Sequence, residues 1–333
     1  MNKVELVRSS KLYKVFKPFY SGCGHVIVFH RVCNSESPIL TNNIQVTPEY
    51  LENVLKYFIS SKIDIVTLDE CYNRITSRKN VKRFVAFTFD DGYSDNMTHA
   101  LPVFEKYNAP LAIFVATGYP EYKILFWGDL LEIFVLNSSK INFNDDSVSY
   151  SYDTLTVDGK RDSFNKIRDY IKKSGHENLQ SRLKNVFGES YNDLIALNKS
   201  LTLTWEQLKE LSNHTLVTIG SHTVNHLVLS KLTDVEVKQE ILESVILIER
   251  KIGKPVFYLA YPYGGDREVS TREYNIAQKC NVKMAFTAKN GNVFKRHARY
   301  LTSIPRIGLN ENWSIPSIDL YINGLTPFLN KFR

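Results

Sequence analysis

Cysteine is scarce in this chain, and long apolar runs are absent. The 333 residues include four cysteines, none with the Cys-x-x-Cys spacing of a zinc or redox motif: Cys23, Cys33, Cys71 and Cys280. We therefore expect free thiols in a reducing compartment, with pairing or shared metal binding of Cys23 and Cys33 as the alternative. No stretch approaches the ~20 apolar residues that span a bilayer, and residues 1–20 lack the continuous apolar region of a secretory signal. These absences predict a cytoplasmic protein.

A clustered basic region is also missing. The chain has 42 Lys and Arg against 35 Asp and Glu, a net charge of +7, and its basic residues form neither an arm nor a nucleic-acid motif. We therefore expect no nucleic acid as a partner, whereas polyanionic glycans, anionic lipid or simple solubility explain the charge equally well. Residues 11–20 are basic and aromatic, so they either pack on the domain or rest on an anionic membrane surface. Peripheral membrane association stays open.

The chain does contain alternating apolar strands and amphipathic helices. Short runs rich in β-branched and aromatic residues predict buried strands at 25–30, 63–68, 84–89, 111–116, 215–219, 256–261, 282–287 and 303–308. Helices between them begin at caps, such as Thr47 before Pro48 and the capping boxes at Thr204, Thr233 and Ser270. This alternation favours an α/β fold, a parallel barrel with its site at the carboxyl ends of the strands.

The alternation is interrupted at residues 119–200, where helical segments flank a hairpin-like stretch at 147–157. We predict that this mixed α/β segment is an insertion over one barrel mouth, because it lacks a linker and its apolar faces need the barrel to cover them. The rest divides into an N-terminal arm at 1–24, a main domain at 25–310 that contains the insertion, and a C-terminal tail at 311–333 that packs on the barrel.

Two adjacent carboxylates end the predicted strand at 84–89. Asp90 and Asp91 are followed by Gly92, which permits a sharp turn. Two acids at the exit of a buried strand repel each other unless a cation lies between them. A solvated Asp-Gly turn is the alternative explanation for this motif alone.

Two histidines follow the predicted strand at 215–219. His222 and His226 have i, i+4 spacing, so both imidazoles can reach one ion. With one carboxylate of the Asp pair they make a two-His, one-Asp set with positions left for water, which is typical of catalytic metal sites. Two surface histidines on one helical turn are the alternative for this pattern by itself.

These motifs resemble those of the NodB-homology polysaccharide deacetylases, carbohydrate esterase family 4. Residues 88–92 (Thr-Phe-Asp-Asp-Gly) match the first motif of that family, and residues 222–226 (His-Thr-Val-Asn-His) match the second. Residues 260–264 (Ala-Tyr-Pro-Tyr-Gly) are similar to the third, and residues 29–32 (Phe-His-Arg-Val) to a first-strand segment of many bacterial members. The resemblance runs from about residue 26 to residue 307 and implies a distorted (β/α)7 barrel.

By this resemblance Asp91, His222 and His226 hold a divalent metal ion, and Asp90 is the general base on the water that the ion binds. Zn2+ is the expected metal, and Co2+, Ni2+ or Mn2+ also suit two histidines and one carboxylate. Tyr263 lies where the third motif supplies a backbone N–H to the oxyanion, with an ordinary Pro-Tyr-Gly turn as the alternative.

The sequence departs from the family pattern in two places. Ala260 stands where many members have an arginine that pairs with the base, and residues 301–306 lack the late Leu-x-His segment. We expect Arg306 to supply the missing charge, with a surface ion pair as its alternative role. We expect His30 to supply the missing acid, with a structural histidine as the alternative. Thr223 is expected to orient the histidine loop through its hydroxyl.

Aromatic residues near the motifs are candidates for sugar contacts. Tyr93 follows the Asp-Asp-Gly turn, Tyr261 lies in the third motif, and Trp127 and Asp129 lie in the insertion. Aromatic rings can stack on a sugar ring while polar neighbours bind its hydroxyls. Core packing is the alternative role of these aromatic side chains.

The resulting hypothesis is a hydrolase of carbon–nitrogen bonds other than peptide bonds, namely a metal-dependent deacetylase that removes the N-acetyl group of an amino sugar. By the resemblance it acts in bacterial surface-polysaccharide synthesis on an N-acetylated sugar, oligosaccharide or lipid-linked precursor. One alternative is a catalytically inactive barrel that binds glycans, which the missing arginine and late histidine favour. Another is a deacetylase that acts on O-acetyl esters.

Overall fold

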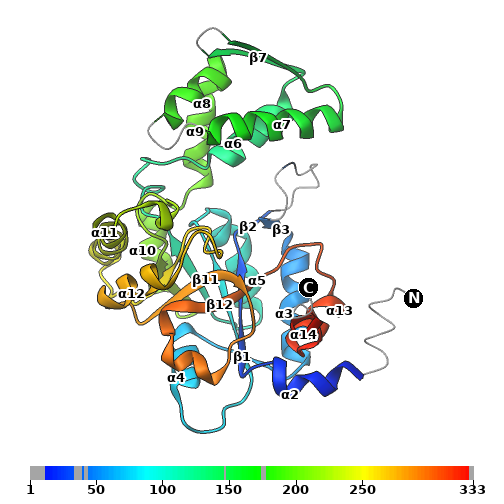
Figure 1. The fold of residues 1–333 in the computed structure, drawn as a ribbon, viewed down its shortest axis with the longest axis vertical. Coiled ribbons are helices and arrows are strands. Elements are labelled where there is room, and N and C mark those ends of the chain that lie inside the picture. The colour runs from blue at the N-terminus through cyan, green and yellow to red at the C-terminus, as the bar shows by residue number, and fades with distance from the viewer. Residues whose placement is uncertain (1–11, 34–39, 41–43, 146–147, 174–177, 330–333) are drawn as a thin grey trace. The chain divides into compact units, whose positions relative to one another are not determined.

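The computed structural model describes residues 12–33, 40, 44–145, 148–173 and 178–329. The chain divides into two compact units, which we call the barrel unit and the insertion unit. The barrel unit comprises residues 1–34, 43–123 and 203–333, and the insertion unit comprises residues 35–42 and 124–202. The insertion unit is mainly green in Figure 1.

Seven parallel strands close a ring in the barrel unit. They are β1 (Gly24–Phe29), β5 (Phe84–Phe89), β6 (Leu111–Val115), β9 (Val217–Ser221), β10 (Tyr258–Ala260), β11 (Met284–Asn290) and β12 (Ile304–Gly308). The order around the ring is β1-β12-β11-β10-β9-β6-β5, and β5 pairs back onto β1 along its whole length. This confirms the predicted (β/α)7 barrel.

Three short strands lie outside this ring. They are β2 (Arg31–Val32), β3 (Gln45–Val46) and β4 (Asp64–Ile65). The predicted strand at 63–68 is reduced to β4, which pairs only with the first two residues of β5. Since β6 pairs with the last two residues of β5, β4 does not interrupt the ring.

Side chains alternate along the ring strands between the barrel interior and the surrounding helices. Along β5, Phe84 and Ala86 belong to an interior cluster, whereas Val85 and Phe87 pack in the cluster that the helices cover. Because strand side chains have a period of two, Asp90 follows Phe84 and Ala86 towards the interior. The barrel therefore presents the first carboxylate of the Asp pair inwards.

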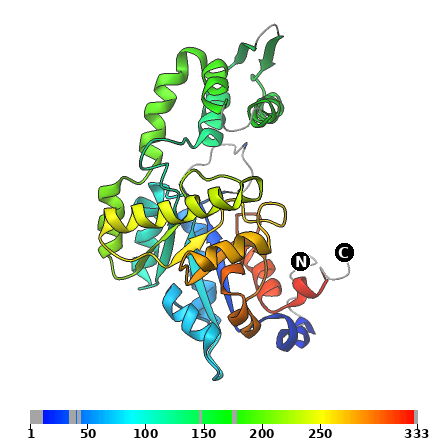
Figure 2. The ribbon, with the colours of Figure 1, turned by 60° about the vertical axis from the view of Figure 1, so that its left-hand side comes forward.

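Helices surround the ring, as Figures 1 and 2 show. They are α3 (Pro48–Ser60), α4 (Leu68–Thr76), α5 (Leu101–Lys106), α10 (Trp205–Asn213), α11 (Asp234–Ile252) and α12 (Thr271–Lys279), with a π-helical turn (Asn96–Ala100) before α5. The cap at Thr47 is confirmed, since its hydroxyl accepts a hydrogen bond from the Tyr50 N–H. Capping boxes are present at Thr204, Thr233 and Ser270, as the sequence predicted.

The insertion unit has a hydrophobic core of its own. Its elements are α6 (Trp127–Asn137), β7 (Lys140–Asp145), β8 (Val148–Asp153), α7 (Val157–Lys172), α8 (Leu179–Phe187) and α9 (Tyr191–Leu201). Leu130, Phe164 and Leu183 are fully buried among its helices, and Ile141 and Phe143 bury one face of the β7–β8 hairpin against them. The hairpin begins before the predicted 147–157, and the unit covers its own apolar faces. Its placement over the barrel mouth stays a prediction.

The two ends of the described chain pack together on the barrel unit. These ends comprise a 3-10 helix (Leu12–Phe16), α2 (Lys17–Tyr20), α13 (Ile315–Ile322) and α14 (Leu325–Leu329). The rings of Phe16 and Phe328 stack with centroids 4.3 Å apart. The buried carboxylate of Asp319 accepts hydrogen bonds of 2.6 Å from the hydroxyls of Tyr13 and Tyr57. Within the described ranges, no helix is both long enough and apolar enough to cross a membrane.

Candidate metal centre and active site

Asp90 and Asp91 lie at the carboxyl end of β5. Asp90 is 3% exposed and Asp91 is 7% exposed, so both carboxylates are largely shielded from water. Asp91 has a φ of 75° and Gly92 a φ of 84°, a left-handed turn directly after the strand. Such backbone conformations are costly for an aspartate and cluster at functional sites. The turn gives the two neighbouring carboxylates different partners.

The structure brings the three predicted metal ligands together. The Nε2 atoms of His222 and His226 lie 3.3 and 3.1 Å from Oδ1 of Asp91. One ligand atom from each residue lies within 4.8 Å of the other two. His226 has a φ of 53°, a left-handed conformation in the loop that carries both imidazoles. Burial acts to raise the pKa of Asp91, but positive charge on the two imidazoles in their protonated forms outweighs it and holds the pKa well below its usual range.

The hydrogen bonds around this cluster fit a cation at its centre. Nδ1 of His222 lies 2.7 Å from the carbonyl oxygen of Ala260. Because a carbonyl can only accept, we assign the proton to Nδ1, which leaves the Nε2 lone pair facing Asp91. Oδ1 of Asp91 is buried and makes no hydrogen bond within the described residues. A buried carboxylate oxygen beside imidazole lone pairs suits a divalent ion with two nitrogen ligands and one oxygen ligand.

Asp90 is bound by an arginine. The Nη1 and Nη2 atoms of Arg306 donate to Oδ1 and Oδ2 of Asp90 at 2.7 and 2.6 Å. Arg306 is 1% exposed, and it also donates to the Thr287 carbonyl and the Thr88 hydroxyl. Burial acts to raise the pKa of Asp90, but the guanidinium outweighs it and holds the pKa below its usual range. The predicted charge beside Asp90 is therefore in place, and the surface ion pair that was the alternative for Arg306 is wrong.

His30 follows β1 at the same end of the barrel. Burial lowers the pKa of His30, while the charges of Asp91 and Asp90 oppose that shift, so the three side chains lie within electrostatic reach of one another. The His30 carbonyl accepts a 2.7 Å hydrogen bond from Nδ2 of Asn96, which fixes the backbone here. The predicted role of His30 as the acid stays a prediction.

Tyr263 stands beside the histidine loop. Its ring centroid lies 4.8 Å from that of His226, and its side chain is 52% exposed. Its φ of 61° is left-handed, and its backbone N–H donates no hydrogen bond to any described residue. Gly264 follows with a φ of 54°, and a Cβ there would come within 2.6 Å of the Ala288 backbone nitrogen. Only glycine therefore fits at position 264, and the turn leaves the backbone N–H of Tyr263 without an acceptor among the described residues.

Glu240 of α11 is a residue that sequence reasoning missed. Its carboxylate is buried, and Oε2 accepts hydrogen bonds of 2.9 Å from the backbone N–H groups of Val224 and Asn225, while Oε1 accepts from Nδ2 of Asn225 at 2.6 Å. These contacts fix the loop between the two histidines. The available signal was an acid on the apolar face of a helix, three residues after Val237.

The prediction that Thr223 orients this loop through its hydroxyl is wrong. Thr223 is fully buried, and its Oγ1 makes no hydrogen bond within the described residues. Its backbone N–H instead donates to Oγ of Ser221 at 3.2 Å. The loop is held through its backbone.

Two of the predicted sugar contacts are buried. Tyr261 is inaccessible to solvent, and its hydroxyl donates to the Thr302 carbonyl at 2.8 Å. Its prediction as a substrate contact is wrong, because its ring belongs to the cluster packed against α11 and α12. Tyr93 is 3% exposed with the Arg31 guanidinium 5.2 Å from its ring centroid, so it offers almost no surface to a sugar. Trp127 and Asp129 belong to the insertion unit, and their substrate role stays a prediction.

Several known proteins with similar sequences or folds are described as deacetylases. The family model described as polysaccharide deacetylase matches residues 77–285. YxkH of Bacillus subtilis (strain 168), whose name includes polysaccharide deacetylase, is 20% identical over 301 residues, which are 90% of this chain and 76% of that protein. Two solved structures share the fold.

The first is the Streptococcus pyogenes deacetylase PplD in complex with acetate, with 19% identity and a TM-score of 0.60 over 90% of this chain and 97% of that chain. The second is IcaB from Ammonifex degensii, with 16% identity and a TM-score of 0.58 over 91% of this chain and 98% of that chain. At this identity the likeness shows a shared fold.

Proposed function

The chain belongs to the polysaccharide deacetylase family, and we propose that it hydrolyses the N-acetyl group of an amino sugar with a divalent ion held by Asp91, His222 and His226. The observation that carries this proposal is the buried pair of Asp90 and Arg306 directly beside that ligand set. Asp91 lies against the two imidazoles, whereas both carboxylate oxygens of Asp90 are bound by Arg306. That division supplies a metal ligand and a base from adjacent residues.

Amide hydrolysis needs a base, a stabilised oxyanion and a proton for the leaving amine. Asp90 accepts the proton of the attacking water, and Arg306 keeps that carboxylate ionised and oriented. The N–H of Tyr263 donates to the oxyanion, and His30 in its protonated, imidazolium form gives its proton to the leaving amine. When bound, the ion lowers the pKa of a water and polarises the acetyl carbonyl. We propose Zn2+, with Co2+, Ni2+ or Mn2+ also compatible with the ligand set.

Acetate release tests this function. We expect the protein to release acetate from N-acetylated chitooligosaccharides or nucleotide-linked N-acetyl sugars, and Asp90→Asn to slow release at least ~100-fold with the bound metal unchanged. Activity that survives Asp90→Asn would show that Asp90 is not the base. Release from O-acetyl esters alone would indicate an esterase, and bound metal without release from any glycan would indicate an inactive glycan-binding barrel.

We further propose that the substrate is a precursor of bacterial surface polysaccharide and that the barrel unit rests on an anionic membrane surface. Phe19 of α2 is 73% exposed and Val15 is 68% exposed, and Leu329 of α14 is exposed as well. The exposed Lys17 lies in the same segment. Exposed apolar side chains beside a cation suit the boundary between lipid headgroups and acyl chains. The cytoplasmic location expected from the sequence stays a prediction.

A further inference from the structure

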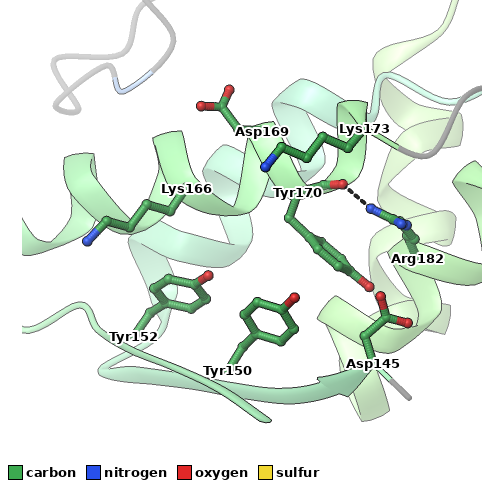
Figure 3. Close-up of a pocket in the computed structure, with 8 residues that line it drawn as sticks. All are labelled: Asp145, Tyr150, Tyr152, Lys166, Asp169, Tyr170, Lys173 and Arg182. Carbon is green, nitrogen blue, oxygen red and sulfur yellow. Dashed lines mark hydrogen bonds between the residues drawn. The ribbon is translucent and has the colours of Figure 1, made fainter. Parts of the chain in front are cut away.

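The insertion unit contains a pocket of its own, which we call the tyrosine pocket. It has a volume of about 420 Å³ and lies between the β7–β8 hairpin and helices α7 and α8 (Figure 3). This volume falls in the range of pockets that bind small molecules. The lining side chains are Asp145, Tyr150, Tyr152, Lys166, Asp169, Tyr170, Lys173 and Arg182.

Three tyrosine rings converge in this pocket from two elements. Tyr150 and Tyr152 are two residues apart on β8, so both side chains extend from the same face of the hairpin towards α7 (Figure 3). Tyr170 extends from α7 towards the hairpin. The rings of Tyr150 and Tyr170 lie 5.2 Å apart, and Tyr150 and Tyr152 stack at 6.4 Å. Phe143 backs Tyr150 at 4.8 Å. The result is a rigid aromatic surface whose outer members, Tyr150 and Tyr152, remain partly exposed.

Arg182 of α8 holds Tyr170, the most buried of the three tyrosines, in place. Its guanidinium donates a hydrogen bond to the Tyr170 carbonyl and lies 4.4 Å from the centroid of the Tyr170 ring. The Tyr170 hydroxyl points towards Asp145 in Figure 3. Burial and that carboxylate raise the pKa of Tyr170 to about 12, so its hydroxyl keeps its proton and can donate. These contacts hold the third ring in place without a ligand.

Two lysines lie on the open side of the pocket. Lys166 extends from α7 and Lys173 from the residue that caps its C-terminus, and both side chains are exposed. Lys166 is paired with Asp162 at 2.7 Å, whereas Asp169 points away from the three tyrosines in Figure 3. The pocket therefore combines aromatic rings and hydroxyl groups with three lining cations and two lining acids, and Lys173 is the exposed cation that no described acid pairs within 4.0 Å.

We propose that the tyrosine pocket binds an acidic sugar, one ring of which packs against Tyr152 and Tyr150 while its carboxylate or phosphate pairs with Lys173. Tyrosine suits this role because its ring contacts the apolar face of a sugar and its hydroxyl bonds to the polar edge. The choice of a sugar rests on the proposed function, since a polysaccharide deacetylase meets glycan chains longer than the reacting residue. The pocket would then select glycans that carry acidic groups.

Direct binding tests the pocket without turnover. The full chain carrying Asp90→Asn is titrated by calorimetry with trigalacturonate, with glucose 6-phosphate and with neutral maltotriose. We expect at least one acidic probe to bind more tightly than maltotriose, with an affinity that falls as salt rises. In the same background, Tyr152→Ala and Lys173→Ala should each weaken that probe about tenfold.

Matched controls separate the pocket from general effects. Lys172→Ala removes a neighbouring exposed lysine that does not line the pocket, and Leu155→Ala removes an exposed side chain of the same unit. Both should leave binding unchanged. Where Tyr152→Ala unfolds the unit, Tyr152→Phe and Lys173→Ala carry the test.

Each outcome bears on the pocket separately from catalysis. Binding by trigalacturonate points to a uronate, and binding by glucose 6-phosphate points to a phosphosugar. The proposal is overturned if neither acidic probe binds or if the pocket variants bind as the controls do. Because binding is measured in the Asp90→Asn background, a lack of deacetylase activity would leave this result standing.

Discussion

Arg306 binds both carboxylate oxygens of Asp90 although 216 positions of sequence separate the two residues. Arg306 lies on β12 two residues after Ile304, whose side chain belongs to the interior cluster, so strand alternation directs Arg306 inwards as well. Asp90 continues the inward-facing side of β5. The closed ring therefore lets a late strand supply a charge that the third motif lacks at Ala260.

Arg306→Lys should reduce kcat about 10- to 100-fold with little change in KM. A lysine keeps the positive charge but cannot make two parallel hydrogen bonds to Asp90, so the proposed base would lose its orientation. Steady-state kinetics on an N-acetylated oligosaccharide, with metal content measured in parallel, checks this. Arg299→Lys, at an exposed arginine, is the matched control and should behave like the unmodified protein. Equal kcat values for the two variants would contradict the role of Arg306.

His226→Gln should lower the bound metal from about one ion per chain to a small fraction, because it removes one of the three proposed protein ligands. Elemental analysis after dialysis against Zn2+ gives the readout without any activity assay. Treatment with a chelator should abolish acetate release, and added Zn2+ should restore it in the unmodified protein but not in the variant. Full metal content in His226→Gln would remove this histidine from the site.

Glu240→Gln should weaken metal binding about 10- to 100-fold while the fold is retained. Oε2 accepts from two backbone N–H groups of the histidine loop, and Oε1 accepts from Nδ2 of Asn225. A glutamine can replace only one of these oxygens with an acceptor, so its NH2 group would face another donor in the loop. Competition with a metal indicator dye measures the affinity. Glu243→Gln on the exposed side of the same helix is the control. A shift of equal size in both variants would mean that Glu240 acts only through the stability of α11.

His25 should make stability depend on pH. Burial lowers its pKa to about 3, and it is held neutral between Asn292 and Arg83. The unfolded chain binds a proton below the ordinary histidine pKa of about 6.5, but the folded chain does not. This contribution is therefore present above that pH and declines as the pH falls. Lowering the pH from 7 to 5 should therefore reduce the free energy of unfolding by about 2 kcal/mol through His25 alone.

Guanidinium unfolding at pH 5 and pH 7 measures that cost. The control is His25→Gln, in which this part of the pH dependence should disappear whatever the absolute stability of the variant. An identical pH dependence in both proteins would show that the pKa of His25 does not change when the chain folds.

Phe19→Ser should reduce binding to vesicles that contain phosphatidylglycerol, because it removes the most exposed aromatic side chain of the apolar surface around α2. Co-sedimentation at low and moderate salt gives the bound fraction. Leu155→Ser removes a similarly exposed apolar side chain from the insertion unit and should have no effect. Unchanged vesicle binding in Phe19→Ser, or no vesicle binding by the unmodified protein, would refute the proposal that the barrel unit rests on an anionic membrane.

Local sequence was sufficient for the parts of this protein that depend on neighbours in the chain. Apolar runs and helix caps predicted the ring strands and the helices around them, and the motifs at 88–92 and 222–226 predicted that Asp91, His222 and His226 lie together. These signals survive because strand periodicity, capping and a two-histidine spacing are encoded within a few residues.

Only the tertiary structure decided which side chains meet. The inward direction of Arg306, the burial of Tyr261 against α11 and α12, and the reach of Glu240 to the histidine loop depend on ring closure and on helix packing. The separate core of the insertion unit also depends on contacts between its own helices and hairpin. A contact between distant segments is set by the geometry of the closed sheet, which no single stretch of the sequence contains.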